Sequence, residues 1–214
     1  MGKLFNLDNP FFRFMEYVAD FFILNILTIV CSIPVFTAGA ALTAHHKVMQ
    51  NIVMDYEQPV CKTYFGAFAG NFKQATVLWL MTLFAVGLIA VDVFLVYVYL
   101  EGLALILYLL LAVAGVVILG TACYAFSMIA RYENTLKAHL RNSFILALGK
   151  LPRTLLMVLL WFLPLILAIL SLSLFLDSLA IWGSFGISLL LYAQARILKP
   201  VFLLLEQEDS PGEG

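Results

Sequence analysis

The chain has 214 residues, of which 64% are hydrophobic and 12% are charged, and its mean hydropathy is +1.02. A soluble domain has about 25% charged residues, and a protein of this size needs a largely polar surface in water. The composition therefore excludes a soluble domain and predicts an all-α integral membrane protein embedded in the lipid bilayer. The net charge of −1 gives no bias toward nucleic acid.

About 20 apolar residues in a helix cross the hydrocarbon core of a bilayer, and several segments of this sequence meet that requirement. The turns between the second and third spans, and between the fourth and fifth, are short enough to join antiparallel helices. The whole chain, 1–214, is predicted to be a single membrane domain. In chain order the predicted spans are 17–38, 75–100, 103–130, 154–176 and 179–205.

Each of the two longer connections carries an amphipathic segment, at 45–58 and at 134–149. In the second segment, Leu136, Leu140 and Phe144 form an apolar stripe whose opposite side is charged. This spacing predicts an amphipathic helix that lies along the membrane interface. The alternative is that both segments are cytoplasmic extensions of the spans and pack on each other.

The distribution of lysine and arginine predicts the topology. The long connections and the end of the last span are basic, whereas the short turns carry Glu101 and Asp177 and no basic residue. Because basic residues stay on the cytoplasmic side, the long connections and the C-terminus are predicted inside and the N-terminus outside. Lys3 and Arg13 oppose that position of the N-terminus. Alternatively, Pro34 splits the first apolar run into a re-entrant hairpin, which places the N-terminus inside.

The two halves of the chain resemble each other when 37–49 is set against 118–130, and 64–81 against 143–160. Each half then contains a span, a small-residue exit, an amphipathic helix and a second span, so both halves have the same orientation. Parallel repeats of this kind occur in transporters; the alternative is the chance similarity of two apolar hairpins. The matched pairs are Gly39 with Gly120, Ala44 with Ala125, Phe65 with Phe144 and Gly70 with Gly149.

Polar side chains recur along the first span. Arg13, Glu16 and Asp20 fall on one helical face, and further polar residues follow deeper in the span. One interpretation is a packing seam that faces the other helices; the other is a polar pathway along the span. The residues assigned to this seam are Asp20, Asn25, Thr28 and Ser32.

Asp92 is the sharpest single candidate for a functional residue. It lies about nine residues from the turn after the second span, which places it about 12 Å into the membrane. A carboxylate at that depth costs about 2.5–3.5 kcal/mol and therefore faces protein or water. Either Asp92 and the seam line an outward-facing cavity, or the carboxyl group hydrogen-bonds to a neighbouring Tyr or Ser.

No arrangement for catalysis or for metal or cofactor binding stands out in the sequence. The three cysteines form no CxxC pair, and His45, His46 and His139 lack the acidic partners of a motif such as HExxH. The protein is predicted to have no cofactor, no metal and no enzymatic activity. A membrane enzyme acting on lipid-linked substrates would lack a recognisable acid–base pair.

The connection after the third span predicts a basic cytoplasmic surface. Such a surface follows from the positive-inside bias and contacts anionic lipid, or it docks a protein partner. The residues assigned to it are Arg131, Lys137, Arg141, Lys150 and Arg153.

Four segments of the chain resemble the YesL-like family of bacterial multi-pass membrane proteins, a family of unknown function. They are "NPFFRFMEYVADFFILN", "SIPVFTAGAALTA", "YFGAFAGNFKQAT" and "LPRTLL", and the resemblance covers residues 5–205. It implies a cell-membrane protein, often encoded beside carbohydrate-uptake ABC transporters and their sensor systems. The family defines no catalytic or binding residues, so none is transferred to this chain.

Two functional hypotheses remain. The first is a non-enzymatic membrane protein that assists carbohydrate uptake or sensing and binds ABC-transporter or sensor subunits through its basic cytoplasmic surface. The second is a small transporter or channel whose outward-facing polar seam is centred on Asp92.

Overall fold

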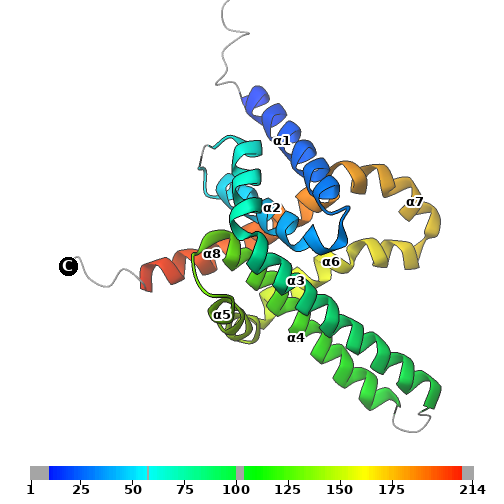
Figure 1. Cartoon of the computed structure of the whole chain (residues 1–214). Helices are drawn as coiled ribbons and strands as arrows, with labels where there is room; N and C mark the ends of the chain where they lie inside the picture. The colour runs from blue at the N-terminus through cyan, green and yellow to red at the C-terminus, as the bar shows by residue number, and fades with distance from the viewer. Residues whose placement is uncertain (1–9, 57, 100–103, 209–214) are drawn as a thin grey trace, which may run out of the picture.

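The structure is a computed structural model that describes residues 10–56, 58–99 and 104–208, and within these ranges every regular element is a helix (Figure 1). Five helical stretches are long and apolar enough to cross a membrane, so the predicted all-α membrane fold is confirmed. The elements are α1 (Pro10–Cys31), η1 (Val35–Thr37), α2 (Ala38–Val53), α3 (Val60–Tyr99), α4 (Ala104–Arg131), α5 (Leu136–Gly149), α6 (Leu151–Leu170), α7 (Leu172–Ile181), η2 (Trp182–Gly186) and α8 (Ile187–Glu208).

The first apolar run, predicted as one span over 17–38, is divided in two. Helix α1 ends at Cys31 and the chain turns before Pro34, because proline disfavours helical backbone in the residue that precedes it. The hydroxyl of Thr37 lies 2.7 Å from the carbonyl oxygen of Pro34 and also bonds the carbonyl of Cys31, which holds the turn. The helix is therefore interrupted before Pro34, as in the alternative that Pro34 splits the run, while a re-entrant hairpin with the N-terminus inside stays a prediction.

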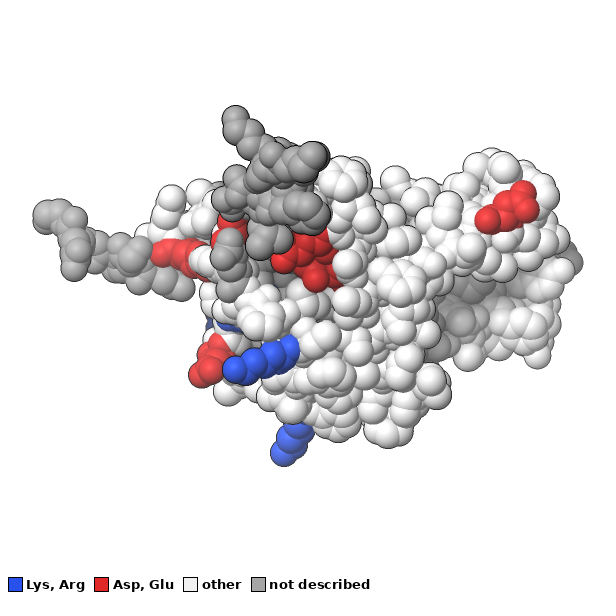
Figure 2. All heavy atoms as spheres, turned by 90° about the horizontal axis from the view of Figure 1, so that it is seen from above, with Lys and Arg blue, Asp and Glu red and all other residues white. Residues whose placement is uncertain are grey.

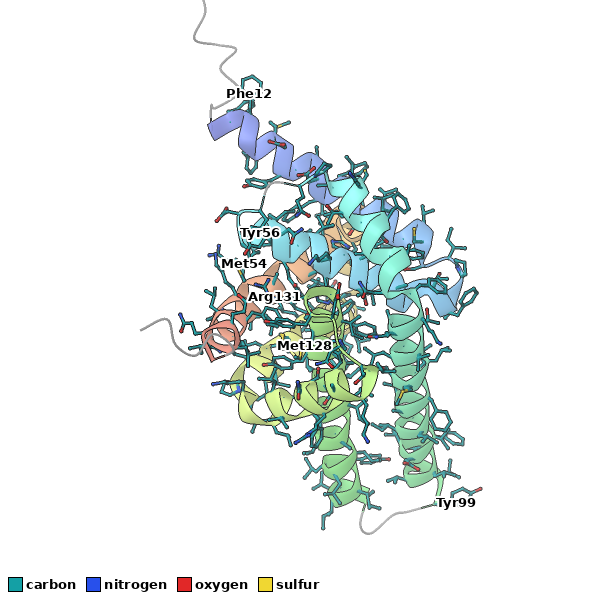
Figure 3. All side chains as sticks on the ribbon, turned by 60° about the vertical axis from the view of Figure 1, so that its left-hand side comes forward. Phe12, Met54, Tyr56, Tyr99, Met128 and Arg131 are labelled. Atoms are coloured by element: carbon teal, nitrogen blue, oxygen red, sulfur yellow. The ribbon has the colours of Figure 1, made fainter. Side chains whose placement is uncertain are left out.

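Helix α2 returns antiparallel to α1. Thr28 Oγ1 and His45 Nδ1 lie 2.8 Å apart near the turn, while Asp20 lies beside Ile52 at the other end of the pair. The N-terminal end of α1 consequently shares one end of the molecule with Tyr56 and the connection 54–59, and Tyr99 lies at the opposite end (Figure 3). A single span over 17–38 would place the start of α1 and this connection at opposite ends, whereas α1 and α2 bring them to the same end. The side of the membrane that each terminus faces stays a prediction.

Helix α2 lies at the centre of the protein. The segment 45–58 was expected to lie along the membrane interface, but the helix ends at Val53 and both of its faces are enclosed by α1, α3, α4 and α8. Small residues at its start permit this: a Cβ on Gly39 would overlap the Ala75 carbonyl and Trp79. Burial of apolar residues from both faces, such as Val48 and Met49, makes α2 the middle of the core.

Helices α3 and α4 form a long hairpin. The first half of α3, before the predicted span at 75–100, packs on α2, whereas the distal half exposes large apolar side chains such as Phe84 and Phe94. On α4, residues 122–130 are buried and the opposite end exposes Leu105 and Ile106. The exposed apolar half of this hairpin is the surface that lipid covers. The turn at 100–103, which includes Glu101, lies outside the described residues.

In the second half of the chain, a break separates the amphipathic helix from the span that follows it. The predicted amphipathic segment 134–149 corresponds to α5, whose first turn is capped because Thr135 Oγ1 accepts from the Ala138 N–H at 3.3 Å. Helix α5 ends at Gly149, and α6 restarts with Pro152 in its first turn, where proline fits. Helices α7 and α8 run into each other through the π-helical turn η2.

Contacts in the structure support the internal repeat. Gly39 packs against Ala75, and their counterparts in the alignment, Gly120 and Thr154, pack against each other in the same way. His46 and its counterpart Ser127 meet directly, with 3.2 Å between His46 Nδ1 and Ser127 Oγ. A direct contact between equivalent residues is the arrangement that parallel repeats related by an axis along the membrane normal would give.

Candidate functional site

One end of the molecule carries most of the charge. On the face shown in Figure 2, the Lys and Arg side chains and several Asp and Glu side chains lie toward one end, and one further acidic patch lies at the far end. This charged end comprises α2, the first half of α3, the end of α4, α5 and the end of α8. The cavities that have charged walls open there.

The predicted basic surface separates into two parts. The side chain of Arg131 is only 11% exposed, and its guanidinium is tied to Glu206 on α8 by Nη2–Oε1 and Nε–Oε1 distances of 2.6 and 2.7 Å. The rings of Tyr132 and Phe202 flank the same guanidinium. Arg131 therefore holds α4 against α8. Lys137, Arg141 and Lys150 are exposed, and Arg153 is partly exposed.

Helix α5 is fixed so that its cations point outward. Its inner face is buried through His139 and Ser143, and the Ser143 hydroxyl lies 3.4 Å from the sulfur of Met128 on α4. Thr154 of α6 donates to the Ala147 carbonyl at 2.8 Å and closes the same face. Lys137 and Arg141, which are one turn apart on the other face, remain exposed as a fixed pair of positive charges.

A groove with basic walls lies between the first half of α3 and the end of α4, and its volume is about 780 Å³. We call it the basic groove. Its three cations come from three different helices, and Glu133 is the one acidic residue in its described lining. The residues that define it are Lys47, Gln58, Lys62, Gly66, Gly70, Asn71, Gln74, Arg131 and Glu133.

A second groove, of about 660 Å³, lies between α1 and the end of α2. Its acidic residues are Glu16, Asp20 and Asp55, and Gln58 lies on the border with the basic groove. Asp55 has a φ of 59°, a left-handed conformation in which the chain leaves α2. Asp20 thus lines a surface groove rather than a path through the membrane.

Asn25 closes the π-helical turn between α7 and α8. A π turn leaves backbone groups without their usual helical partners. Asn25 Nδ2 donates to the Gly183 carbonyl at 2.6 Å, and Asn25 Oδ1 accepts from the Ser188 N–H at 3.2 Å. The Ser188 hydroxyl donates back to the Phe21 carbonyl at 2.7 Å. Asn25 is fully buried, so its amide pins α1 to the last span.

A buried polar strip continues from Thr28 through the centre of the protein. Burial lowers the pKa of His45 to about 3, with a further contribution from His46, and lowers the pKa of His46 to about 4. Both imidazoles are therefore neutral at pH 7. Because Ser127 Oγ donates to the Cys123 carbonyl at 2.9 Å, it accepts from His46 Nδ1–H, which assigns the tautomer of His46.

Several side-chain atoms of this interior have no partner among the described residues. They are His45 Nε2, Gln50 Oε1, Tyr64 Oη, Thr76 Oγ1, Tyr124 Oη, His139 Nε2 and Gln194 Oε1.

The structure does not bring the predicted polar seam together with Asp92. Asn25 and Thr28 are buried in contacts between helices, and Ser32 lies partly buried in the turn before Pro34. Asp92 is exposed on the distal half of α3 and has no hydrogen-bond or ion-pair partner in the described parts of the chain. Asn25 and Thr28 thus contribute to contacts between helices, and Asp92 stands apart from them.

Sequence reasoning placed the three histidines on cytoplasmic helices and missed that all three are buried. The signal was present in the small residues that precede His45, since a run such as "AGAALTA" indicates close helix packing rather than an exposed surface. The basic groove was also missed, because its cations lie far apart in the sequence.

The profile of a family described as "Protein of unknown function, DUF624" matches residues 21–93, which include the second half of α1, all of α2 and most of α3. The match therefore contains the α1–α2 hairpin and the α3 wall of the basic groove, and the description assigns no activity to them. No curated protein matches the chain. No solved structure matches it either.

Proposed function

We propose that the protein is a non-enzymatic membrane protein that assists carbohydrate uptake or sensing, and that it docks its partner on α5. The observation that carries the docking surface is the rigid outward placement of Lys137 and Arg141 by the buried face of the same helix. In the described parts of the chain, neither cation has an ion-pair partner. An acidic surface on a membrane subunit is their natural complement.

The sidedness of this proposal follows from charge. With α1 and α2 as a hairpin, the first turn of α1, the connection 54–59, α5 and the end of α8 all belong to the charged end. We propose that this end faces the cytoplasm, in accord with the positive-inside rule. Arg13, which opposed the simple five-span topology, then lies on the same side as the other basic residues.

The carbohydrate part of the proposal rests on the resemblance to the YesL-like family, whose members are often encoded beside carbohydrate ABC transporters and sensors. The docking part rests on α5 alone. The competing transporter hypothesis needs a polar path that includes Asp92, and the exposed, isolated position of Asp92 gives it no support.

Co-purification of the full-length protein in mild detergent tests the proposal. We expect the wild-type chain to recover a membrane subunit of a carbohydrate transporter or a sensor, and the double variant Lys137→Glu/Arg141→Glu to lose it. Lys73→Glu is the matched control, since Lys73 is equally exposed but lies on α3. Equal recovery by both variants would end the assignment of α5 as the docking surface.

A further inference from the structure

The basic groove has an excess of unneutralised positive charge. Of its three cations, only Arg131 has an ion-pair partner among the described residues, because Glu206 holds it from the α8 side. Lys62 is exposed at the start of α3, and Lys47 is half-buried on α2. Burial and, to a smaller extent, the nearby Arg131 lower the pKa of Lys47, and Lys47 has no ion-pair partner among the described residues.

Polar donors line the groove next to these cations. The Oε1 atom of Gln58 accepts from Asn51 Nδ2 at 2.9 Å and from Thr63 Oγ1 at 3.3 Å. These two bonds fix the Gln58 amide and leave its NH2 group available as a donor. Across the groove, Gln74 Nε2 donates to the Asn134 carbonyl at 2.9 Å, which ties α3 to the connection after α4.

Two glycines leave the α3 wall of the basic groove without side chains at two positions. Gly66 and Gly70 are one helical turn apart, and a Cβ added to either would meet nothing within 4 Å. A glycine inside a helix costs about 1 kcal/mol relative to alanine, and no close helix packing explains these two. What they provide is open space beside Lys47 and Lys62, the two cations without a partner.

We propose that the basic groove binds a phosphate group, carried either by an anionic lipid headgroup or by a soluble phosphorylated compound. Two ammonium groups and an amide donor match the several acceptor oxygens of a phosphate, and Lys binds phosphate as a point charge. A volume of about 780 Å³ exceeds that of the phosphate alone and leaves room for the molecule that carries it. The site goes beyond the proposed docking function, since no residue of α5 lines it.

Two variants test the site on the full-length protein in nanodiscs. Lys47→Gln/Lys62→Gln removes the unpaired charges, and Gly66→Leu/Gly70→Leu fills the open space without changing the charge. The matched controls are Lys137→Gln/Arg141→Gln on α5 and Gly149→Leu, since a Cβ on Gly149 also meets nothing within 4 Å. Lys62→Gln alone, at an exposed position, covers the case in which the change at Lys47 impairs folding.

The two sources of phosphate are separated by the probe. Inorganic phosphate is titrated against protein in pure phosphatidylcholine nanodiscs, with chloride at equal ionic strength as the reference. In the second arm, native mass spectrometry measures how much phosphatidylglycerol the protein retains from mixed nanodiscs. Saturable phosphate binding identifies a soluble ligand, and selective retention of phosphatidylglycerol identifies a lipid headgroup.

We expect at least one arm to show binding that both groove variants weaken about tenfold or more, the effect of losing one charge-assisted contact, while both controls bind as the wild type does. Binding in neither arm would overturn the proposal, and so would binding that the groove variants and the α5 controls affect equally. Loss of the α5 docking partner would leave this result unchanged, so the two proposals fail separately.

Discussion

The contact between Asn25 and the π-helical turn predicts a large loss of stability from a single substitution. Asn25→Leu keeps the approximate volume of the side chain but removes the three bonds of its amide. These are the short bond to the Gly183 carbonyl at 2.6 Å, a long one to the Trp182 carbonyl at 3.4 Å, and the bond from the Ser188 N–H at 3.2 Å. The position is fully buried, so no bulk water replaces them. The substitution leaves the Gly183 carbonyl and the Ser188 N–H unpaired between α1 and the last span.

The expected cost follows from those two groups. A buried polar group left without a partner costs about 1–3 kcal/mol, whereas hydrogen bonds between membrane helices average about 0.6 kcal/mol because alternative partners are found. Backbone groups in a π turn have few alternatives, so we expect a total of about 2–4 kcal/mol. Asn142→Leu on the exposed face of α5 is the control and should change stability by less than about 0.5 kcal/mol.

A double-mutant cycle tests whether the cost of Asn25→Leu arises from its contact with the π-helical turn. A π turn is a one-residue insertion in an α-helix, so deletion of Gly183 restores α-helical bonding without changing the register of α7 or α8. We expect the cost of Asn25→Leu to be much smaller in the chain that lacks Gly183. The assay is reversible unfolding in mixed micelles or by steric trapping. Equal costs in both backgrounds, or a cost no larger than that of Asn142→Leu, would refute the role given to Asn25.

Three further predictions concern the core and the charged end. Gly39→Leu should lower the thermal midpoint in detergent markedly, because its side chain overlaps the Ala75 carbonyl, whereas Gly87→Leu, at an open position of α3, should not. Arg131→Met should destabilise the chain by about 1–2 kcal/mol, since it removes the guanidinium from Glu206, whose own side chain is 40% exposed and remains hydrated, and a chemical-unfolding midpoint equal to wild type would contradict this. The pKa values of His45 and His46 lie near 3 and 4 in the folded state and near 6.5 when unfolded, so the free energy of unfolding should fall as the pH is lowered from about 6.5 toward 4. In His46→Asn the free energy of unfolding should depend less on pH. The same pH dependence in the variant and the wild type would argue against burial of a neutral His46.

The sequence was sufficient for the fold class because a chain with 64% hydrophobic residues has no soluble alternative. Long apolar runs also marked the later spans, since such runs are the strongest signal in such a chain. The turn expected between the fourth and fifth spans, at 176–179, lies inside α7, however, and the helix breaks at Ser171 instead. The first apolar run was predicted as a single span because a hydropathy average does not show where the chain reverses its direction. Only Pro34 and the small residues after it carried that information, through backbone restriction and close packing.

The site was harder to predict than the fold. Asp92 was a candidate because placing an isolated carboxylate in the membrane costs free energy. Its surroundings depend on the rotation of α3 about its own axis, which periodicity alone does not fix. Asn25 and Thr28 were correctly placed on an inward face of α1, but their partners at Gly183 and His45 lie on other helices. The basic groove combines residues from three helices and was visible only once those helices were assembled.

The most direct test of the account is the sidedness of three positions in a chain whose native cysteines have been replaced. Single-cysteine variants Phe12→Cys, Tyr56→Cys and Tyr99→Cys are labelled in oriented vesicles with a maleimide that does not cross the membrane. The α1–α2 hairpin predicts that Phe12→Cys and Tyr56→Cys react from the same side, and that Tyr99→Cys reacts from the other side (Figure 3). Labelling of Phe12→Cys from the side that labels Tyr99→Cys would contradict the hairpin, and with it the single charged end on which both proposed sites depend.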